Sequence, residues 1–222
     1  MLSLVSAYLV SLSGCGPTDS SRVNVSNATP LDLLRSYQVA VSKRDYASIL
    51  ECMEPELRKE AEPMLSAHKD LVAKGTALER MLHQRFGRAK AKHFRDGMYQ
   101  TINRMFDSVL LWIGPDGQVG RGAKITQSGN VARVEVLGKD VGIEAPRYDT
   151  QWLILFAPDR MSGRYLDAYQ RMLRATSREF ACIIKGIRDG TITRGNIDDI
   201  LSGVKPPPGM LDEGLVPFPA GT

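Results

Sequence analysis

The chain has 222 residues, of which 43% are hydrophobic and 24% charged, and its 29 basic and 25 acidic side chains give a net charge of +4. This length and composition supply one hydrophobic core of ordinary size and do not require a second domain. The small positive excess favours an anionic partner, such as anionic lipid, lipopolysaccharide or a polyanionic wall polymer, over a neutral one.

The chain opens on an apolar leader. Residues 2–12 carry no charge and are well short of the roughly 20 residues that a membrane-spanning helix needs, which is typical of a signal peptide. The tetrad Leu12-Ser13-Gly14-Cys15 follows directly and resembles the lipobox of bacterial lipoproteins. The resemblance implies that residues 1–14 are removed and that Cys15 carries a diacylglycerol, with palmitate. An apolar helix with an incidental cysteine is the alternative.

The lipobox resemblance also implies an address. It places the protein in the bacterial cell envelope, anchored to a membrane through its N-terminal lipid, without distinguishing the inner from the outer membrane. A nucleic-acid partner is excluded by that compartment. Residues 15–28 are rich in Ser, Asn and Thr and predict a flexible tether before a single domain over residues 29–203. Residues 204–222, with three consecutive prolines, predict an irregular tail.

Helical patterns dominate the first part of the domain. Thr29 is a good N-cap, proline follows at the first helical position, and apolar residues then recur at helical spacing, which predicts a helix from Pro30 to Lys43. Asp45 can cap a second, short helix through Met53.

Glycines divide the next helical stretch in the prediction. A third helix is expected from about Glu56 to Lys74, with Gly75 as its stop. The T-x-x-E capping box that starts at Thr76 predicts a fourth helix from Ala77 to Phe86, and a further helix is expected over residues 90–106.

The pattern then changes from helical to extended. Strands are expected over residues 109–113, 123–127, 131–137 and 151–156, so that the sheet covers about 109–157. Ser128-Gly129-Asn130 predicts a hairpin turn, and residues 151–156, which are apolar on both faces, predict a central strand.

A regular apolar stripe predicts a long amphipathic C-terminal helix over about residues 165–189. Asn196 can cap a short helix from Ile197 to Leu201. The fold class is therefore α+β, with N-terminal helices, a curved antiparallel sheet and a long C-terminal amphipathic helix. Self-association through the stripe of the long helix is one hypothesis for its role.

A family resemblance supports this order of elements. The segment Tyr37-x-x-Ala40-Val41-x-x-Arg44-Asp45-Tyr46-x-x-Ile49-Leu50-x-x-Met53-x-Pro55-Glu56 resembles the opening of nuclear transport factor 2-like domains. The resemblance covers about residues 30–157 and implies a cone-shaped α+β fold with helices packed in a curved antiparallel sheet. It carries no catalytic residue over to this chain.

One segment concentrates positive charge. Six basic residues occur between positions 80 and 95, and this segment contains no acidic residue. It also contains two histidines, His83 and His93. They are candidate contacts to an anionic surface, since each basic residue near a negative membrane surface contributes about 1 kcal/mol. The alternative is a solvated face that acidic residues elsewhere in the fold neutralise. The six are Arg80, Arg85, Arg88, Lys90, Lys92 and Arg95.

Aromatic residues suggest a second candidate site. Trp112, Tyr148 and Trp152 are candidates to line a concave pocket for an apolar small molecule, while the alternative is that these rings fill the core.

Catalytic and metal-binding patterns are absent from the sequence. The three histidines lack metal-ligand spacing, no G-x-S-x-G elbow occurs, and nothing indicates a cofactor. Cys52 and Cys182 could be oxidised in an exported protein, but both fall in expected helices, where small buried thiols are common.

The sequence therefore favours a lipid-anchored envelope protein that acts as a binding or assembly module, without an identified catalytic residue. Its partner would be an envelope protein or an anionic polymer. A small-molecule carrier or enzyme that uses the cavity of a cone-shaped fold is the alternative.

Overall fold

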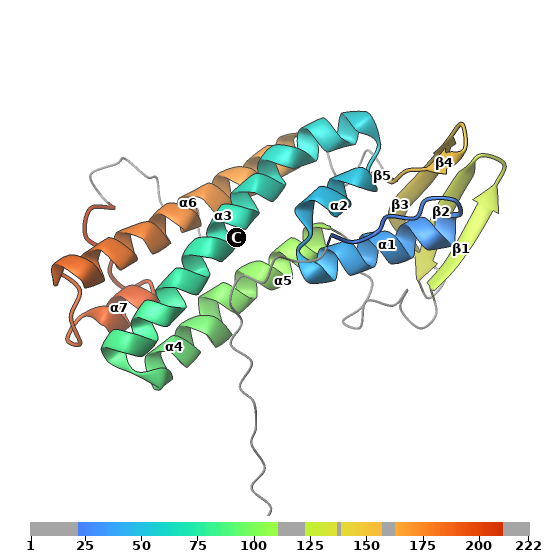
Figure 1. Ribbon diagram of the computed structural model, residues 1–222. Coiled ribbons are helices and arrows are strands. Elements are labelled where there is room, and N and C mark those ends of the chain that lie inside the picture. The colour runs from blue at the N-terminus through green and yellow to red at the C-terminus, as the bar shows by residue number, and fades with distance from the viewer. Residues whose placement is uncertain (1–21, 111–122, 137–138, 157–162, 211–222) are drawn as a thin grey trace, which may run out of the picture.

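A computed structural model of the protein describes residues 22–110, 123–136, 139–156 and 163–210. The described part combines a bundle of long helices with an antiparallel sheet at one end, and the first two helices lie beside the sheet (Figure 1). The fold is α+β, as predicted.

The first two helices form where the sequence predicts them. Helix α1 spans Pro30–Lys43, and the Thr29 side chain accepts a hydrogen bond from the Asp32 N–H at its start. Arg44 then adopts a left-handed conformation with a φ of 57°, which reverses the chain into α2, Tyr46–Glu51. Asp45 caps α2 through the Ser48 N–H.

Helix α3 runs without a break from Pro55 to Phe86, so the predicted stop at Gly75 is wrong. Gly75 is instead a place of close packing. A Cβ atom there would lie 2.5 Å from Cε2 of Tyr99, so the absence of a side chain lets the Tyr99 ring lie against the helix. The expected N-cap residue, Thr76, donates its hydroxyl to the Val72 carbonyl inside the same helix.

The chain turns back after Gly87 and packs against α3. Helix α4 covers Arg88–Phe94, a π-helical turn labelled η1 covers Arg95–Tyr99, and α5 covers Gln100–Val109. Gly97 has non-helical angles, so this second arm is kinked. The strand expected from residue 109 is wrong at its start, because Val109 ends α5, and residues 111–113 lie outside the described residues.

Within the described ranges, the sheet contains five strands. Strands β1, Ala123–Ser128, and β2, Val131–Val136, form the predicted hairpin, in which Ile125 lies opposite Val134. Strand β3, Lys139–Tyr148, pairs with β2 and is not among the predicted strands. Its Gly142 and Pro146 weaken the strand pattern, although Ile143 and Ala145 are buried on one face.

The segment expected as a central strand lies at the edge of the sheet. Strands β4, Gln151–Trp152, and β5, Leu155–Phe156, both pair with β3. Beyond them, the Ile154 N–H donates to the Cys52 carbonyl and the Glu54 N–H donates to the Ile154 carbonyl. The connection between α2 and α3 covers this edge of the sheet. The segment is therefore buried and apolar on both faces although it is not a central strand.

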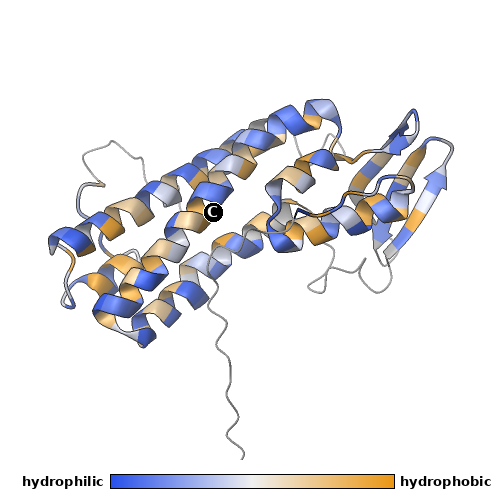
Figure 2. Ribbon diagram, viewed as in Figure 1, coloured by the Kyte–Doolittle hydropathy of each residue, from blue (hydrophilic) through white to orange (hydrophobic). Residues whose placement is uncertain are grey.

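Helix α6 spans Gly163–Asp189 and lies alongside α3, and the short helix α7 spans Ile197–Leu201. The apolar stripe of α6 is buried inside the protein, as at Leu173, Phe180 and Ile183. Figure 2 shows the same alternation of apolar and polar segments along both long helices. The structure thus gives the stripe an internal partner and removes the basis for self-association through it.

The folded domain begins upstream of Thr29. The Val23 N–H donates to Asp45 Oδ2 over 2.7 Å, and the Ser48 hydroxyl donates to the Val23 carbonyl. Asn27 accepts a hydrogen bond from the Trp152 N–H. Residues 22–28 are therefore part of the domain and do not belong to the expected tether. Of the helices in the described ranges, none has the length and apolar character needed to cross a membrane.

Candidate anion-binding groove

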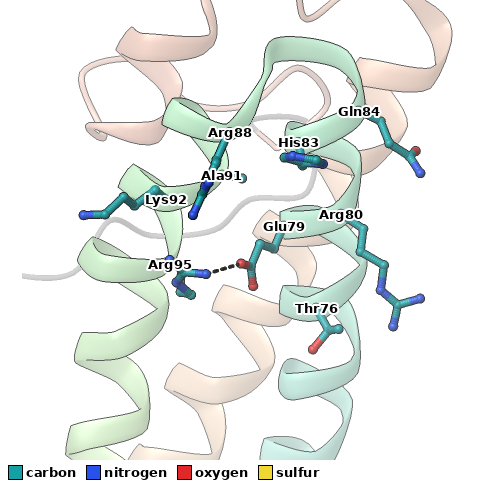
Figure 3. A pocket seen from close by; sticks show the side chains of 9 residues that line it. All are labelled: Thr76, Glu79, Arg80, His83, Gln84, Arg88, Ala91, Lys92 and Arg95. Atoms are coloured by element: carbon teal, nitrogen blue, oxygen red, sulfur yellow. Dashed lines mark hydrogen bonds and ion pairs between the residues drawn. The ribbon is translucent and has the colours of Figure 1, made fainter. Parts of the chain in front are cut away.

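Two helical stripes face each other near the turn between α3 and α4 and enclose a groove (Figure 3). On each helix the lining residues recur three and four positions apart, which places them on a single face. The groove has a volume of about 520 Å³. Its lining is Thr76, Glu79, Arg80, His83 and Gln84 from α3, Arg88, Ala91 and Lys92 from α4, and Arg95 from the start of η1.

A one-residue connection holds the two stripes together. Gly87 has φ 94° and ψ 171°, a region that only glycine adopts without strain, and its N–H donates to the Leu82 and His83 carbonyls. On the inner side of α4, Ala91 and Phe94 are buried, and Phe94 packs edge-on against Phe180 of α6. The groove therefore stands on the packed core of the bundle.

Three of the predicted basic residues form ion pairs. Arg95 contacts Glu79 across the groove at 3.1 Å and also contacts Asp96, while Lys92 contacts Asp96 at 2.7 Å. Lys90 pairs with Asp198 of α7. The hydrogen bond from Lys92, followed by the one from Arg95, holds the pKa of Asp96 below its ordinary value, so this carboxylate is ionised. Acidic residues therefore neutralise three of the six basic residues, as the alternative interpretation of this segment expects.

The structure differs at the other three basic residues. Within the described ranges, Arg80, Arg85 and Arg88 make no ion pair with an acidic side chain, and all three are exposed. Arg80 and Arg88 line the groove and Arg85 does not. In Figure 3, Arg88 extends from α4 into the space between the helices, and His83 lies on the facing side of α3.

The structure brings four of the six predicted basic residues into one groove and sets two apart. Arg85 and Lys90 lie outside its lining. The groove also includes Thr76, Glu79 and Gln84, which the sequence analysis did not connect with the basic segment. Glu79 and Gln84 follow Thr76 by three and eight residues along α3, and this spacing was the available signal. Of the two neighbouring phenylalanines, Phe94 is buried and Phe86 is partly buried, so neither offers an apolar anchor to a membrane.

The candidate aromatic pocket is not assembled by the described residues. Trp152 is only 3% exposed and belongs to the core, whereas Tyr148 is 44% exposed at the end of β3. Trp112 lies outside the described residues. Neither Trp152 nor Tyr148 lines the groove between α3 and α4, the shallow groove on the outer face of the sheet, or the one beside Gly97.

Cys52 is a buried free thiol, so it forms no disulfide with Cys182. Burial, followed by the negative charge of Glu51, raises the pKa of Cys52 to about 12, so its thiol stays protonated and is a poor nucleophile. The predicted lipid-attachment residue, Cys15, lies outside the described residues.

One histidine is buried in the helical part of the core. His68 stacks on Phe106 with ring centroids 3.4 Å apart, and its Nδ1 lies 3.0 Å from the Tyr46 hydroxyl. Burial, followed by the positive charge of Arg44, lowers the pKa of His68 to about 3. In the part of the chain that the structure describes, no three His, Cys, Asp or Glu side chains gather as metal ligands.

Comparisons of this chain with protein-family models, with curated proteins and with solved structures found no match.

Proposed function

We propose that this chain is a lipid-anchored protein of the bacterial cell envelope that works as a binding module. Cys15 carries the lipid, and the basic groove between α3 and α4 holds an anionic partner. The observation that carries the proposal is the groove itself, where Arg80 and Arg88 face solvent without an acidic partner among the described residues. The anchor is supported by the Leu12-Ser13-Gly14-Cys15 tetrad.

The charge of the groove favours binding by an anion over a purely structural role. If the charges of the groove served only to stabilise the helical hairpin, we would expect each one to be paired with an opposite charge, as Arg95 is with Glu79. Arg88 brings an exposed guanidinium group into the space between the helices, where Lys92 and Arg95 also line the groove, and like charges close together destabilise the hairpin. An anion that enters the groove removes this repulsion and gains charge-assisted hydrogen bonds.

Chromatography on immobilised polyanions tests the groove. The full chain, purified in a non-ionic detergent, is loaded on polyphosphate and on polyglutamate resins and eluted with salt. We expect the Arg80→Ala/Arg88→Ala variant to elute at lower salt, because it loses about 2 kcal/mol of attraction, roughly thirty-fold in affinity.

The matched control is Arg35→Ala/Arg174→Ala, which removes two exposed arginines from α1 and α6 and keeps the same net charge as the groove variant. This control should elute close to the parent protein. If the two double variants elute together, net charge alone accounts for retention and the groove is not the binding site.

Metabolic labelling tests the anchor. A clickable palmitate analogue should label the protein in growing bacteria, and Cys15→Ser should abolish both the label and the membrane fraction. Unchanged fractionation of an unlabelled Cys15→Ser protein would refute the anchor while leaving the groove to its own test.

A further inference from the structure

We infer that two copies of this chain pair through the outer edge of strand β1, Ala123–Ser128, with Ile125 on the twofold axis. This interface is separate from the groove and from the lipid anchor, and its test is independent of theirs.

Strand β1 lies at the end of the sheet, where β2 is its neighbour among the described strands. Figure 1 shows β1 on the side of the sheet farthest from the long helices. The opposite edge is covered, because Ile154 bonds to the connection between α2 and α3 and Trp152 bonds to Asn27. In the part of the chain that the structure describes, β1 is therefore the edge whose backbone is open to another strand.

The hairpin decides which backbone groups of β1 face outward. Its two-residue loop joins Ser128 to Val131, and the hydrogen bonds that close such a loop run between these two residues. Bonding to the neighbouring strand then occurs at every second residue of an antiparallel pair. The N–H and C=O groups of Ala123, Ile125 and Gln127 therefore point away from β2.

Strand β1 lacks the features that commonly keep an edge strand from pairing. It contains no proline, and its register with β2 has no bulge. Its one charged residue, Lys124, lies opposite Glu135 of β2, so that its charge is offset. A regular edge of six residues is a template for another extended chain.

A second copy of β1 fits this edge in one register. When two β1 strands run antiparallel about an axis at Ile125, Ala123 of each copy lies opposite Gln127 of the other. All the outward groups then pair, in about six hydrogen bonds. An axis at Thr126 would instead place Ala123 opposite Gly129, which belongs to the turn. Because β1 is far from the long helices, the axis at Ile125 puts the two helical bundles at opposite ends of the pair.

The side chains agree with this axis. Ile125 is partly buried against the core, and its counterpart in the second copy, about 5.5 Å away between Cα atoms, covers its exposed part. On the outer face Lys124 lies opposite Thr126 of the other copy, so no two lysines face each other. Each copy uses its own open edge in the contact, so assembly closes at two copies.

Light scattering of the full chain in non-ionic detergent, with micelles in excess over protein, tests the pairing. The interface is short, so the dimer is weak, and the protein mass should rise from that of a monomer toward that of a dimer with concentration. Gln127→Pro should weaken the dimer about tenfold or more, because proline removes an outward N–H that β2 does not use. Gln127→Ala keeps this N–H and should change the dissociation constant about twofold at most.

Disulfide trapping tests the axis with the backbone of β1 intact. The background is Cys15→Ser/Cys182→Ser, which removes the two cysteines other than the buried Cys52. Ile125→Cys places two thiols on the axis within reach of a disulfide, whereas Lys124→Cys places their Cα atoms beyond the limit of about 7 Å. Mild oxidation should therefore trap at least fivefold more dimer with Ile125→Cys than with Lys124→Cys.

Four results would overturn the inference. They are a mass that stays at the monomer at every concentration, a mass that grows past the dimer, equal dimerisation of Gln127→Pro and the parent, and equal trapping through Lys124→Cys and Ile125→Cys. If Gln127→Pro melts well below the parent, the trapping experiment decides instead.

Discussion

His68 makes the stability of the protein depend on pH. Its pKa is about 3 in the folded protein, against an ordinary value of 6.5 in the unfolded chain. Between these values the unfolded chain binds the proton and the folded protein does not, so the free energy of unfolding falls as the pH drops below about 6.5. From pH 7 to pH 4.5 this one residue should account for a loss of about 2 to 3 kcal/mol.

Urea unfolding at the two pH values measures this effect. His68→Gln keeps a polar partner for the Tyr46 hydroxyl but cannot take up a proton, so its stability should fall less between pH 7 and pH 4.5. The control is His93→Gln, which changes an exposed histidine of α4 and should follow the parent protein. The same pH dependence in the parent and in His68→Gln would refute the assignment.

Gly75 provides a second prediction for a single residue. Gly75→Ala should destabilise the protein by about 1 to 3 kcal/mol, because the new methyl group meets the ring of Tyr99 at 2.5 Å. In a Tyr99→Ala background the obstacle is gone, and alanine is the better helix former by about 1 kcal/mol. There the same substitution should be neutral or stabilising, and thermal melting of the four proteins checks this change of sign.

Among the elements, α3 and α6 are joined by a polar contact at the margin of their apolar interface. The Ser177 hydroxyl of α6 donates to Asp70 of α3, and Lys74 contacts both Asp70 at 2.8 Å and Ser177 at 3.0 Å. Ser177 is only 1% exposed. Ser177→Ala should lower the free energy of unfolding by about 1 to 2 kcal/mol, since the hydroxyl of Ser177 is buried and its partners are charged.

Ser42→Ala is the matched control for Ser177→Ala. The Ser42 hydroxyl is exposed and donates only to the Val39 carbonyl of its own helix, so its removal should have almost no effect on urea unfolding. Equal effects of the two substitutions would mean that the contact between α3 and α6 contributes nothing.

Local patterns predicted the elements that local interactions determine. The cap at Thr29 and the turn at Gly129 are read within a few residues, and both α1 and the β1–β2 hairpin form as predicted. The sequence wrongly indicated a helix stop at Gly75, because the residue that this glycine packs against, Tyr99, lies on the other arm of the helical hairpin. Strand β3 was missed because its Gly142 and Pro146 obscure an alternation that pairing with β2 stabilises.

The candidate site, too, was only partly predictable from the sequence. The basic character of residues 80–95 was evident from the sequence, whereas the separation into paired and unpaired charges was not. Lys90 finds its acidic partner, Asp198, more than one hundred residues later. Which arginines remain available to a ligand depends on such distant contacts, and these follow from the packing of α7 on the hairpin.

At the scale of the whole molecule, residues 22–28 link the start of α2 to strand β4 of the sheet. A protein that starts at Thr29 loses the hydrogen bonds of Val23 with Asp45 and Ser48 and the one between Asn27 and Trp152. Asp45, which is buried, would then lack one of its N–H donors. Relative to a chain that starts at Ser21, the shorter chain should lose about 2 to 4 kcal/mol of unfolding free energy by urea unfolding. Equal stability would show that residues 22–28 lie on the domain without contributing to it.

The covered edge of the sheet also has a kinetic consequence. Asn27, Cys52 and Glu54 meet the segment from Trp152 to Ile154, about one hundred residues farther along the chain. Closing so long a loop is slow compared with forming a helical hairpin from neighbouring residues. We therefore expect the α3–α4 arms to form early and the sheet border to close last. Until it closes, the backbone of the open strand is exposed to other unfolded chains, so aggregation during folding should depend on how quickly this border closes.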